Sequence, residues 1–424
     1  MTKSPYPTGW TAGSQVGDRA VGAGYFRGVN LNSGNSNYNH QDNHYHALAV
    51  RAGECHVPVS FTALHTAYRA ARRGKKASWD QLAFDATWLD QIFDLQDRLS
   101  TGTWHPGAPT CRIVTDPKHR KIHAPPFADR VVHHWLVPQL EAIFEPTFIH
   151  DSYSNRRGKG THMAVKRLQG FVREVNSGQG GGYYLQLDIK NFFNTIHRPT
   201  LYAMLKPRME RAGISEAARR AVHALLTYPL SRTGVRWASS VAERNAVPAH
   251  KRLENAAPGC GIAIGNLSSQ FLANVNLNPL DQFIKHVLKA SRYLRYVDDF
   301  VLVHRDRDQL TRWLAEITEF LGDELRLELK SDQRLRPLRD GVDFLGYVIR
   351  PTHTLVRRRV VSHAREKLDA WHRCHEKSRP AAADVERLRA VCASYAGHFS
   401  HANTWRLREQ FRKRYPWLSD ALRQ

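Results

Sequence analysis

Three aspartates stand at the ends of short apolar stretches in this chain of 424 residues. Asp298 and Asp299 are adjacent and lie between the stretches 293–296 and 300–303, and Asp188 ends the alternating stretch 184–188. Two carboxylates on a tight turn between strands provide the hard oxygen ligands that Mg²⁺ prefers when it also holds substrate phosphates. An upstream strand-end aspartate added to such a pair is the arrangement of a two-metal nucleotidyl-transfer site.

Strands and helices around these aspartates must hold them in place. The stretch 184–188 and the hairpin 293–303 alternate as strands, and 342–349 reads as a closing strand. Helical spacing covers 269–288 and 310–321. These elements predict an α+β fold with an antiparallel sheet and helices on one face.

Further elements are expected upstream. Helical spacing begins at Phe61 and recurs over 85–100 and 129–144, and 110–123 alternates as two short strands with its turn at 116–119. A run of basic residues precedes a helix start near Thr161, where backbone amides can also meet an anion. We interpret the run as contacting phosphate, with a solvated charge run as the alternative; its cations are Arg156, Arg157 and Lys159.

Composition points to a polyanionic partner. The formal net charge is +23, from 62 Lys and Arg against 39 Asp and Glu. Such an excess favours a nucleic acid. The five cysteines include no Cys-x-x-Cys pair, which argues against a disulfide framework or a zinc site and favours the reducing cytoplasm. No apolar run approaches roughly 18 residues, so no membrane partner is expected.

Six blocks occur in an order that resembles the reverse transcriptases. They are residues 112–114 with 121–124 and 129–134; 151–162; the strand ending at Asp188; 261–271; the hairpin at 296–299; and 344–347. Three further features resemble the enzymes of diversity-generating retroelements: the block 264–270, the sequel 351–355, and 396–398 with 401–404. Some prokaryotic reverse transcriptases of antiviral defence systems are close relatives of those enzymes.

The resemblance implies a right-hand polymerase with fingers, an antiparallel palm sheet and a helical thumb. The expected parts are an Asn/Gly-rich N-terminal extension (1–55), fingers (56–183), a palm with a fingers insertion (184–350) that includes a polar loop at 229–258, and a basic helical thumb (351–424). The extension is expected to be poorly ordered. Alternatively, residues 29–51 resemble the Asn-rich tail of the lectin-fold proteins that such retroelements diversify. The polar loop receives no assigned chemistry.

The resemblance also assigns the metal site. Asp188 and Asp298 are expected to bind two Mg²⁺ ions, for which Mn²⁺ can substitute, and Asp299 supports the ion that activates the primer 3′-hydroxyl. Ile189, beside Asp188, belongs to the same expected metal set.

Around the incoming nucleotide, Phe193 matches the ring that lies under the sugar and leaves no room for a 2′-hydroxyl; Phe192 is the neighbouring choice. Ile264 stands where most reverse transcriptases have a glutamine, and the loss of that amide predicts low fidelity; the alternative is a packing role. The other expected nucleotide contacts are Arg112, Lys121, Lys190, Gly265 and Gln270. The expected nucleic-acid contacts, besides the basic run, are Tyr296, Arg357, Arg358 and Arg359.

The sequence therefore predicts an RNA-directed DNA polymerase, a nucleotidyltransferase that copies template RNA into cDNA from deoxynucleoside triphosphates and is error-prone within a diversity-generating retroelement. One alternative is an antiphage-defence enzyme that uses a dedicated noncoding RNA. Another is a catalytically inactive RNA-binding scaffold, which the three intact aspartates disfavour. The resemblance adds a small basic four-helix accessory protein as a partner. The template, the primer and the oligomeric state stay open.

Overall fold

The computed structural model describes residues 59–74, 76–115, 119–177, 181–228, 234–376 and 380–423, together with strands β1 (Phe26–Val29) and β2 (Ser36–Asn39). The chain divides into two units, Met1–Cys55 and His56–Gln424. In the first unit β1 and β2 pair in antiparallel fashion. The rest of the predicted N-terminal extension, including most of 29–51, lies outside the described residues.

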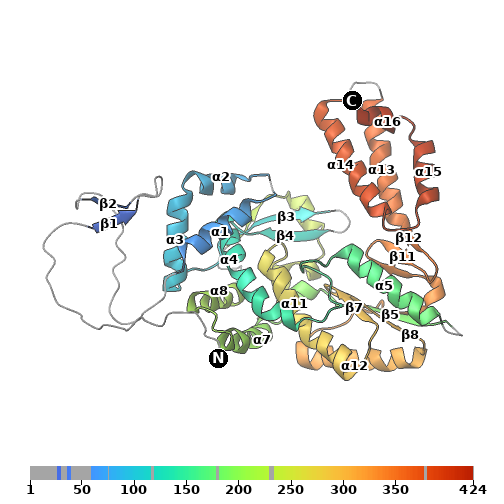
Figure 1. Cartoon of the computed structure of the whole chain (residues 1–424), viewed down its shortest axis with the longest axis horizontal. Helices are drawn as coiled ribbons and strands as arrows, with labels where there is room; N and C mark the ends of the chain where they lie inside the picture. The colour runs from blue at the N-terminus through green and yellow to red at the C-terminus, as the bar shows by residue number, and fades with distance from the viewer. Residues whose placement is uncertain are drawn as a thin grey trace, which may run out of the picture. The chain divides into compact units, whose positions relative to one another are not determined.

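A four-stranded antiparallel sheet forms the centre of the second unit (Figure 1). Its strands, in spatial order, are β7 (Tyr293–Tyr296), β8 (Asp299–His304), β5 (Tyr183–Asp188) and β9 (Arg334–Pro337). Successive side chains of a strand point to opposite faces. Leu185 and Leu187 accordingly enter one hydrophobic cluster, whereas Tyr184 enters another.

Helices cover both faces of this sheet. Helices α11 (Leu267–Gln282) and α12 (Arg307–Leu325) share the cluster of Leu185, and α5 (Thr161–Asn176) shares the cluster of Tyr184. The prediction of an α+β fold is confirmed, and α5 lies on the sheet face opposite α11 and α12. The reason is that both strand faces are apolar, as Phe300 and Val301 show, so each requires a cover.

The fingers elements precede the sheet in sequence. They are α1 (Phe61–Arg72), α2 (Trp79–Ala86), α3 (Trp88–Thr101), β3 (Thr110–Val114), β4 (Arg120–Ala124) and α4 (Phe127–Phe144). The predicted helix over 85–100 is interrupted because Thr87 leaves the helical conformation with φ −129° and ψ 34°. Part of the predicted turn, residues 116–118, lies outside the described residues.

The polar loop joins the fingers instead of standing apart from them. Its described part contains β6 (Arg236–Trp237), α10 (Val241–Asn245) and two short 3-10 turns, and β6 pairs in parallel with β3. Helices α7 (Arg198–Arg211) and α8 (Glu216–Thr227) connect β5 to this loop.

The predicted closing strand over 342–349 is a hairpin. β10 (Val342–Phe344) pairs with β11 (Tyr347–Ile349), and β12 (Thr354–Val356) adds a third strand. Leu345 and Gly346 form a two-residue turn with φ of 49° and 90°. Two positive φ angles in succession are typical of the tight turns that join twisted hairpin strands, and this is why the single strand is not formed.

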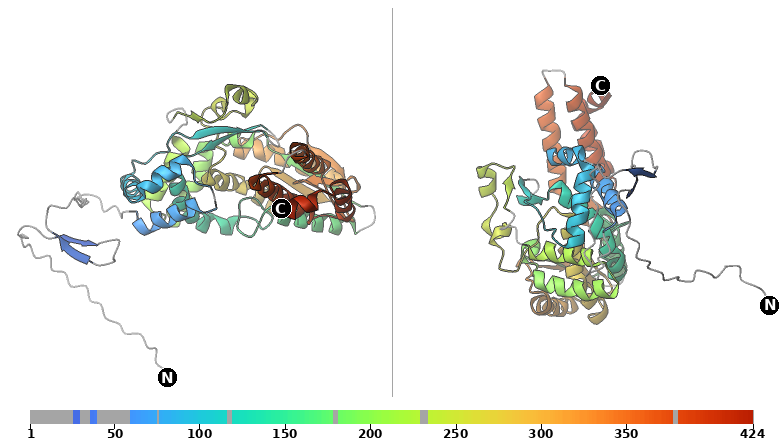
Figure 2. Two further views of the ribbon diagram at one scale, coloured as in Figure 1. Left: turned by 90° about the horizontal axis from the view of Figure 1, so that it is seen from above. Right: turned by 90° about the vertical axis from the view of Figure 1, so that its left-hand side faces the viewer.

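The C-terminal part is helical, as predicted. It comprises α13 (Arg358–His375), α14 (Ala382–Phe399), α15 (Trp405–Arg414) and α16 (Leu418–Arg423), which Figure 2 shows gathered in one bundle. Leu368 and Leu388 anchor its small core. The bundle is tied to the hairpin sheet, because the Tyr347 hydroxyl donates to the His398 carbonyl at 2.9 Å. None of the described helices combines the length and apolarity needed to cross a membrane.

Candidate active site

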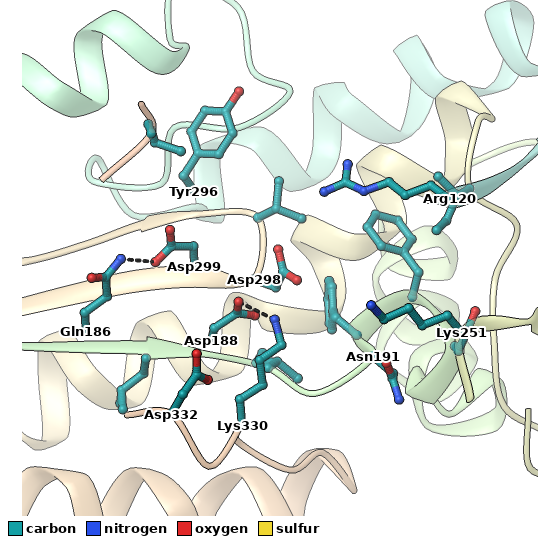
Figure 3. Close-up of a pocket in the computed structure, with 18 of the residues that line it drawn as sticks. Arg120, Gln186, Asp188, Asn191, Lys251, Tyr296, Asp298, Asp299, Lys330 and Asp332 are labelled. Atoms are coloured by element: carbon teal, nitrogen blue, oxygen red, sulfur yellow. Dashed lines mark hydrogen bonds and ion pairs between the residues drawn. The ribbon is translucent and has the colours of Figure 1, made fainter. Parts of the chain in front are cut away.

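The three aspartates meet at one edge of the central sheet (Figure 3). Asp188 lies opposite Asp299 in the β5–β8 register, and Tyr296 lies opposite Asp299 across the β7–β8 hairpin. Val297 and Asp298 form the two-residue turn between them. Val297 has φ 57°, which is rare for a β-branched residue, so the surrounding contacts must hold this turn in place.

Burial and neighbouring carboxylates raise the pKa of Asp298 and Asp299. Burial, followed by the charge of Asp188, raises the pKa of Asp298 to about 6. Burial also raises the pKa of Asp299 to about 7; the 3.1 Å hydrogen bond from Gln186 opposes that rise, and the charges of Asp188 and Asp298 add to it. Carboxylates with this behaviour are stabilised in their ionised form when a cation arrives.

A lysine contacts one of the three aspartates. The Lys330 ammonium contacts Asp188 Oδ2, and the other oxygen of Asp188 is buried and has no hydrogen-bond partner. In this arrangement no three His, Cys, Asp or Glu side chains of the described residues are close enough together to hold a metal ion. The donor chemistry nevertheless fits Mg²⁺: three carboxylates share one edge, one oxygen is unsatisfied, and burial raises the pKa of two of the acids.

The aspartates line a cavity of about 700 Å³. Phe193, Ile264 and Tyr296 also line it. The Ile262 amide donates to the Phe193 carbonyl at 2.8 Å, and the Ile264 carbonyl accepts from the His123 amide at 2.7 Å. The segment that carries Ile264 is therefore hydrogen-bonded on one side to the Phe193 turn and on the other to β4.

Glycine is required next to Ile264. Gly265 has φ +120°, and a Cβ atom there would lie 2.8 Å from Ile122 Cγ2 and 3.0 Å from the His123 carbonyl oxygen. The positive φ of Gly265 and its close contact with β4 therefore both require glycine at this position.

Residues 115–349 match the family model of reverse transcriptase (RNA-dependent DNA polymerase), which is more than half of the chain. The chain belongs to the reverse transcriptase family. Among curated relatives it is 22% identical to protein YkfC of Escherichia coli strain K12, over 62% of this chain and 71% of that protein. It is 23% identical to the group II intron-encoded protein LtrA of Lactococcus lactis subsp. cremoris, over 69% of this chain and 55% of LtrA.

Solved structures of telomerases are similar at a greater distance. The Candida albicans telomerase, solved with a fragment of telomeric RNA, has a TM-score of 0.39 and 11% identity over 76% of this chain and 60% of its own. The Candida tropicalis telomerase has a TM-score of 0.42 and 10% identity over 64% of this chain and 60% of its own.

Of the predicted nucleotide contacts in this reverse transcriptase, Phe193 and Ile264 lie in the cavity. Phe192 borders it too, but its side chain is only 2% exposed and belongs to the core. Gln270 is exposed on α11 and does not line the cavity. Ile189 is buried at the end of β5, and its amide donates to the Asp298 carbonyl at 3.3 Å. Its role here is to fix the aspartate turn.

The predicted triphosphate cations differ in their surroundings. Lys121 is 6% exposed, and its ammonium binds Glu254 at 2.7 Å. Lys190 pairs with Glu328 at 2.8 Å and does not line the cavity. Arg112 is exposed on β3. Lys121 and Arg120 both line the cavity, but the Lys121 ammonium is bound to Glu254, whereas the Arg120 side chain extends toward Asp298.

The predicted phosphate-binding run is only partly available to a ligand. The Arg156 guanidinium donates to Glu145 at 2.8 Å and to the carbonyls of Ile149 at 2.7 Å and Ser152 at 2.9 Å. These partners within the chain occupy the Arg156 guanidinium. Lys159 donates to the His150 carbonyl at 2.9 Å, and Arg157 is exposed.

The remaining predicted nucleic-acid contacts lie near the cavity or at the start of α13. Tyr296 lines the cavity, and its hydroxyl accepts from Thr161 at 3.1 Å. Arg357 lines it as well and pairs with Asp343. Arg358 and Arg359 are the first two residues of α13 and are exposed.

Sequence reasoning missed five charged residues of the cavity. They are Arg120, Lys251, Lys330, Asp332 and Arg334. The strand alternation around Lys121 is the pattern that points to Arg120. Lys251 lies in the polar loop and Lys330 in a segment without clear periodicity, so no local pattern connects either of them with the aspartates.

Proposed function

We propose that this chain is an RNA-directed DNA polymerase that copies template RNA into cDNA from deoxynucleoside triphosphates by two-metal nucleotidyl transfer. The observation that carries the proposal is the convergence of Asp188, Asp298 and Asp299 on a cavity that also contains Phe193. Membership of the reverse transcriptase family supports the same activity.

In this reaction the aspartates and Phe193 would have separate roles. Asp188, Asp298 and Asp299 would hold the ions, which supply an activated primer hydroxyl and neutralise phosphate charge when bound. Phe193 supplies a rigid wall that an added 2′-hydroxyl would meet. The aspartate turn sits on hydrogen-bonded strands, so the carboxylates are positioned before the substrate enters.

For the biological setting we favour a diversity-generating retroelement. Ile264 supports this choice, because an apolar side chain in the cavity offers the nascent base pair no hydrogen bond to check. An antiphage-defence enzyme with a dedicated noncoding RNA is the alternative. Sequencing the RNA and cDNA that copurify with the protein separates the two, because a retroelement enzyme carries cDNA with scattered substitutions relative to its template RNA.

Primer extension on a defined RNA template tests the polymerase proposal. The wild type is expected to make full-length cDNA with Mg²⁺, and Asp298→Asn combined with Asp299→Asn is expected to make none while retaining RNA affinity, since the basic surface is unchanged. Asp94→Asn with Asp97→Asn, on the exposed side of α3, is the charge-matched control and should extend normally.

Mn²⁺ binding followed by electron paramagnetic resonance gives a readout that does not depend on turnover. The aspartate double variant should lose the bound ions that the wild type and the α3 control retain. Extension at the wild-type rate by the aspartate double variant would refute the site.

A further inference from the structure

The polar loop brings a cation to the wall of the catalytic cavity. Lys251 ends a 3-10 turn of this loop, and Figure 3 shows its side chain and that of Arg120 extending toward the side where Asp188 and Asp298 lie. Within the part of the chain that the structure describes, neither cation has an ion pair or a hydrogen bond from its side chain. Lys330, by contrast, is committed to Asp188.

The loop is fastened to the fingers at several points, so the place of Lys251 is defined. The Arg236 amide donates to the Pro109 carbonyl at 3.0 Å, and the Ala238 amide donates to the Cys111 carbonyl at 2.9 Å. These bonds add β6 to the edge of the β3–β4 hairpin.

An ion pair between the buried Lys121 and the exposed Glu254 makes the second connection. Lys121 Nζ lies 2.7 Å from Glu254 Oε2 and 4.5 Å from the centre of the Trp237 ring, whose distance from Arg244 Cζ is 4.2 Å. Both Glu254 and Trp237 belong to the loop, and Glu254 is three positions beyond Lys251. Lys121 therefore acts from within β4 as an anchor for the segment that carries Lys251.

The charges on the two sides of the cavity indicate the role of Arg120 and Lys251. Asp188, Asp298 and Asp299 occupy one side of the cavity. A nucleotide that reacts at these carboxylates carries its anionic triphosphate away from the primer end. Arg120 and Lys251 stand on the side of the cavity away from Gln186 and Asp299, in place to meet that charge.

We propose that Lys251 binds the triphosphate tail of the incoming nucleotide, so that the polar loop forms a wall of the nucleotide site, and that Lys121 and Glu254 position it. This inference rests on the proposed polymerase function. Lys251 acts as a point charge on the tail, together with Arg120. The family resemblance predicts that Lys121 touches the triphosphate. In this proposal Lys121 instead holds the loop segment that carries Lys251.

Single-nucleotide incorporation by Lys251→Gln tests the proposal. KM for the deoxynucleoside triphosphate should rise roughly five-fold, as expected for an exposed charged contact, with kcat nearly unchanged. The KM for pyrophosphate in the reverse reaction should rise in parallel, because the tail becomes that product. Added salt should shrink both differences. Lys251→Arg should restore most of the affinity.

The anchor is tested by combining variants. Glu254→Gln alone should raise the same KM, and it should add little to Lys251→Gln, because both act through one contact. Lys206→Gln, an exposed lysine on α7 paired with Glu210, is the matched control and should leave every constant unchanged.

Two outcomes would overturn the inference. One is an unchanged KM in Lys251→Gln; the other is weaker primer–template binding with unchanged KM, which would place Lys251 on the template. Equilibrium binding of a fluorescent deoxynucleoside triphosphate to the wild type and Lys251→Gln keeps the two proposals apart. If the wild type does not extend primers, the polymerase proposal fails, and the binding comparison still decides whether Lys251 holds a triphosphate.

Discussion

The fully buried guanidinium of Arg295 donates a 2.9 Å hydrogen bond to the carbonyl of Val297, the residue with positive φ in the aspartate turn. The same guanidinium binds Asp281 through two hydrogen bonds of 2.8 and 2.6 Å, and Asp281 also accepts from the Tyr293 hydroxyl at 2.6 Å. An ion pair within the core thus fixes the backbone from which Asp298 extends. Arg295 is a positioning residue for the active site.

Substitution of Arg295 should affect folding and the site together. In Arg295→Met the buried Asp281 loses its partner, and we expect a loss of about 3–5 kcal/mol in the free energy of unfolding. Arg295→Lys keeps the charge but not the forked geometry, so the folded protein should have a lower kcat and weaker Mn²⁺ binding with little change in KM. Urea unfolding and primer extension measure these effects.

Arg292→Lys is the matched control, because its ion pair with Glu174 lies at the surface of the same strand region. Arg292→Lys should leave the free energy of unfolding, kcat and Mn²⁺ binding unchanged. Wild-type Mn²⁺ affinity and kcat in Arg295→Lys would show that Arg295 serves folding alone.

Mg²⁺ should stabilise this protein most at neutral and alkaline pH. The folded pKa values of Asp298 and Asp299, about 6 and 7, exceed the ordinary value of 3.8. Between these values the folded state without metal binds more protons than the unfolded state, so its stability falls as pH rises from about 4 to 7. Mg²⁺ competes with those protons. At roughly 100 times its dissociation constant it should add about 2.7 kcal/mol.

Thermal unfolding with and without Mg²⁺, at about pH 5 and pH 8, checks this. The rise in Tm should be larger at the higher pH and absent from the double variant Asp298→Asn, Asp299→Asn. An equal rise at both pH values in the wild type would show that the ion binds elsewhere.

The positions of the three candidate catalytic aspartates could be predicted because they depend on local patterns. Alternation along β5 and β8 places Asp188 and Asp299 at the same edge, and two residues between alternating strands define the turn that carries Asp298. The split of the predicted strand 342–349 into β10 and β11 could not be predicted in this way. It occurs at Leu345, which has a positive φ, and leucine rarely adopts that backbone conformation.

The partners of charged side chains were less predictable. Arg156 and Lys121 read as surface cations in the sequence, yet tertiary contacts bring a carboxylate to each, Glu145 and Glu254. Sequence distance conceals such pairs: Lys121 and Glu254 are separated by 133 positions. The contribution of Lys251 depends on that same long-range contact.

Sugar selection should depend on Phe193. Its side chain lines the cavity, whereas that of the adjacent Phe192 is 2% exposed and packed in the core. Phe193→Val opens space for a 2′-hydroxyl and should raise ribonucleotide incorporation, relative to deoxynucleotide incorporation, roughly ten-fold. Phe192→Val should instead lower Tm through the cavity it creates, with an unchanged ratio. A changed ratio in Phe192→Val alone would move the sugar contact by one residue.

Fidelity should depend on Ile264, whose backbone is held between β4 and the Phe193 turn while its side chain lines the cavity. A mismatched base is penalised when it leaves a polar group of the pocket without a hydrogen bond. The Ile264 side chain has no such group, so the wild type should misincorporate readily. The family resemblance predicts that this happens opposite template adenine. Ile264→Gln or Ile264→Asn returns a hydrogen-bonding group.

The gain in accuracy should be modest, since one recovered hydrogen bond contributes about 0.5–1.5 kcal/mol, which corresponds to roughly a few-fold to ten-fold in error rate. Products of extension on one RNA template, sequenced for the wild type and both variants, measure it. Equal and low error at adenine in all three would assign Ile264 a packing role and favour the antiphage alternative, because the retroelement choice rests on miscopying that this side chain permits.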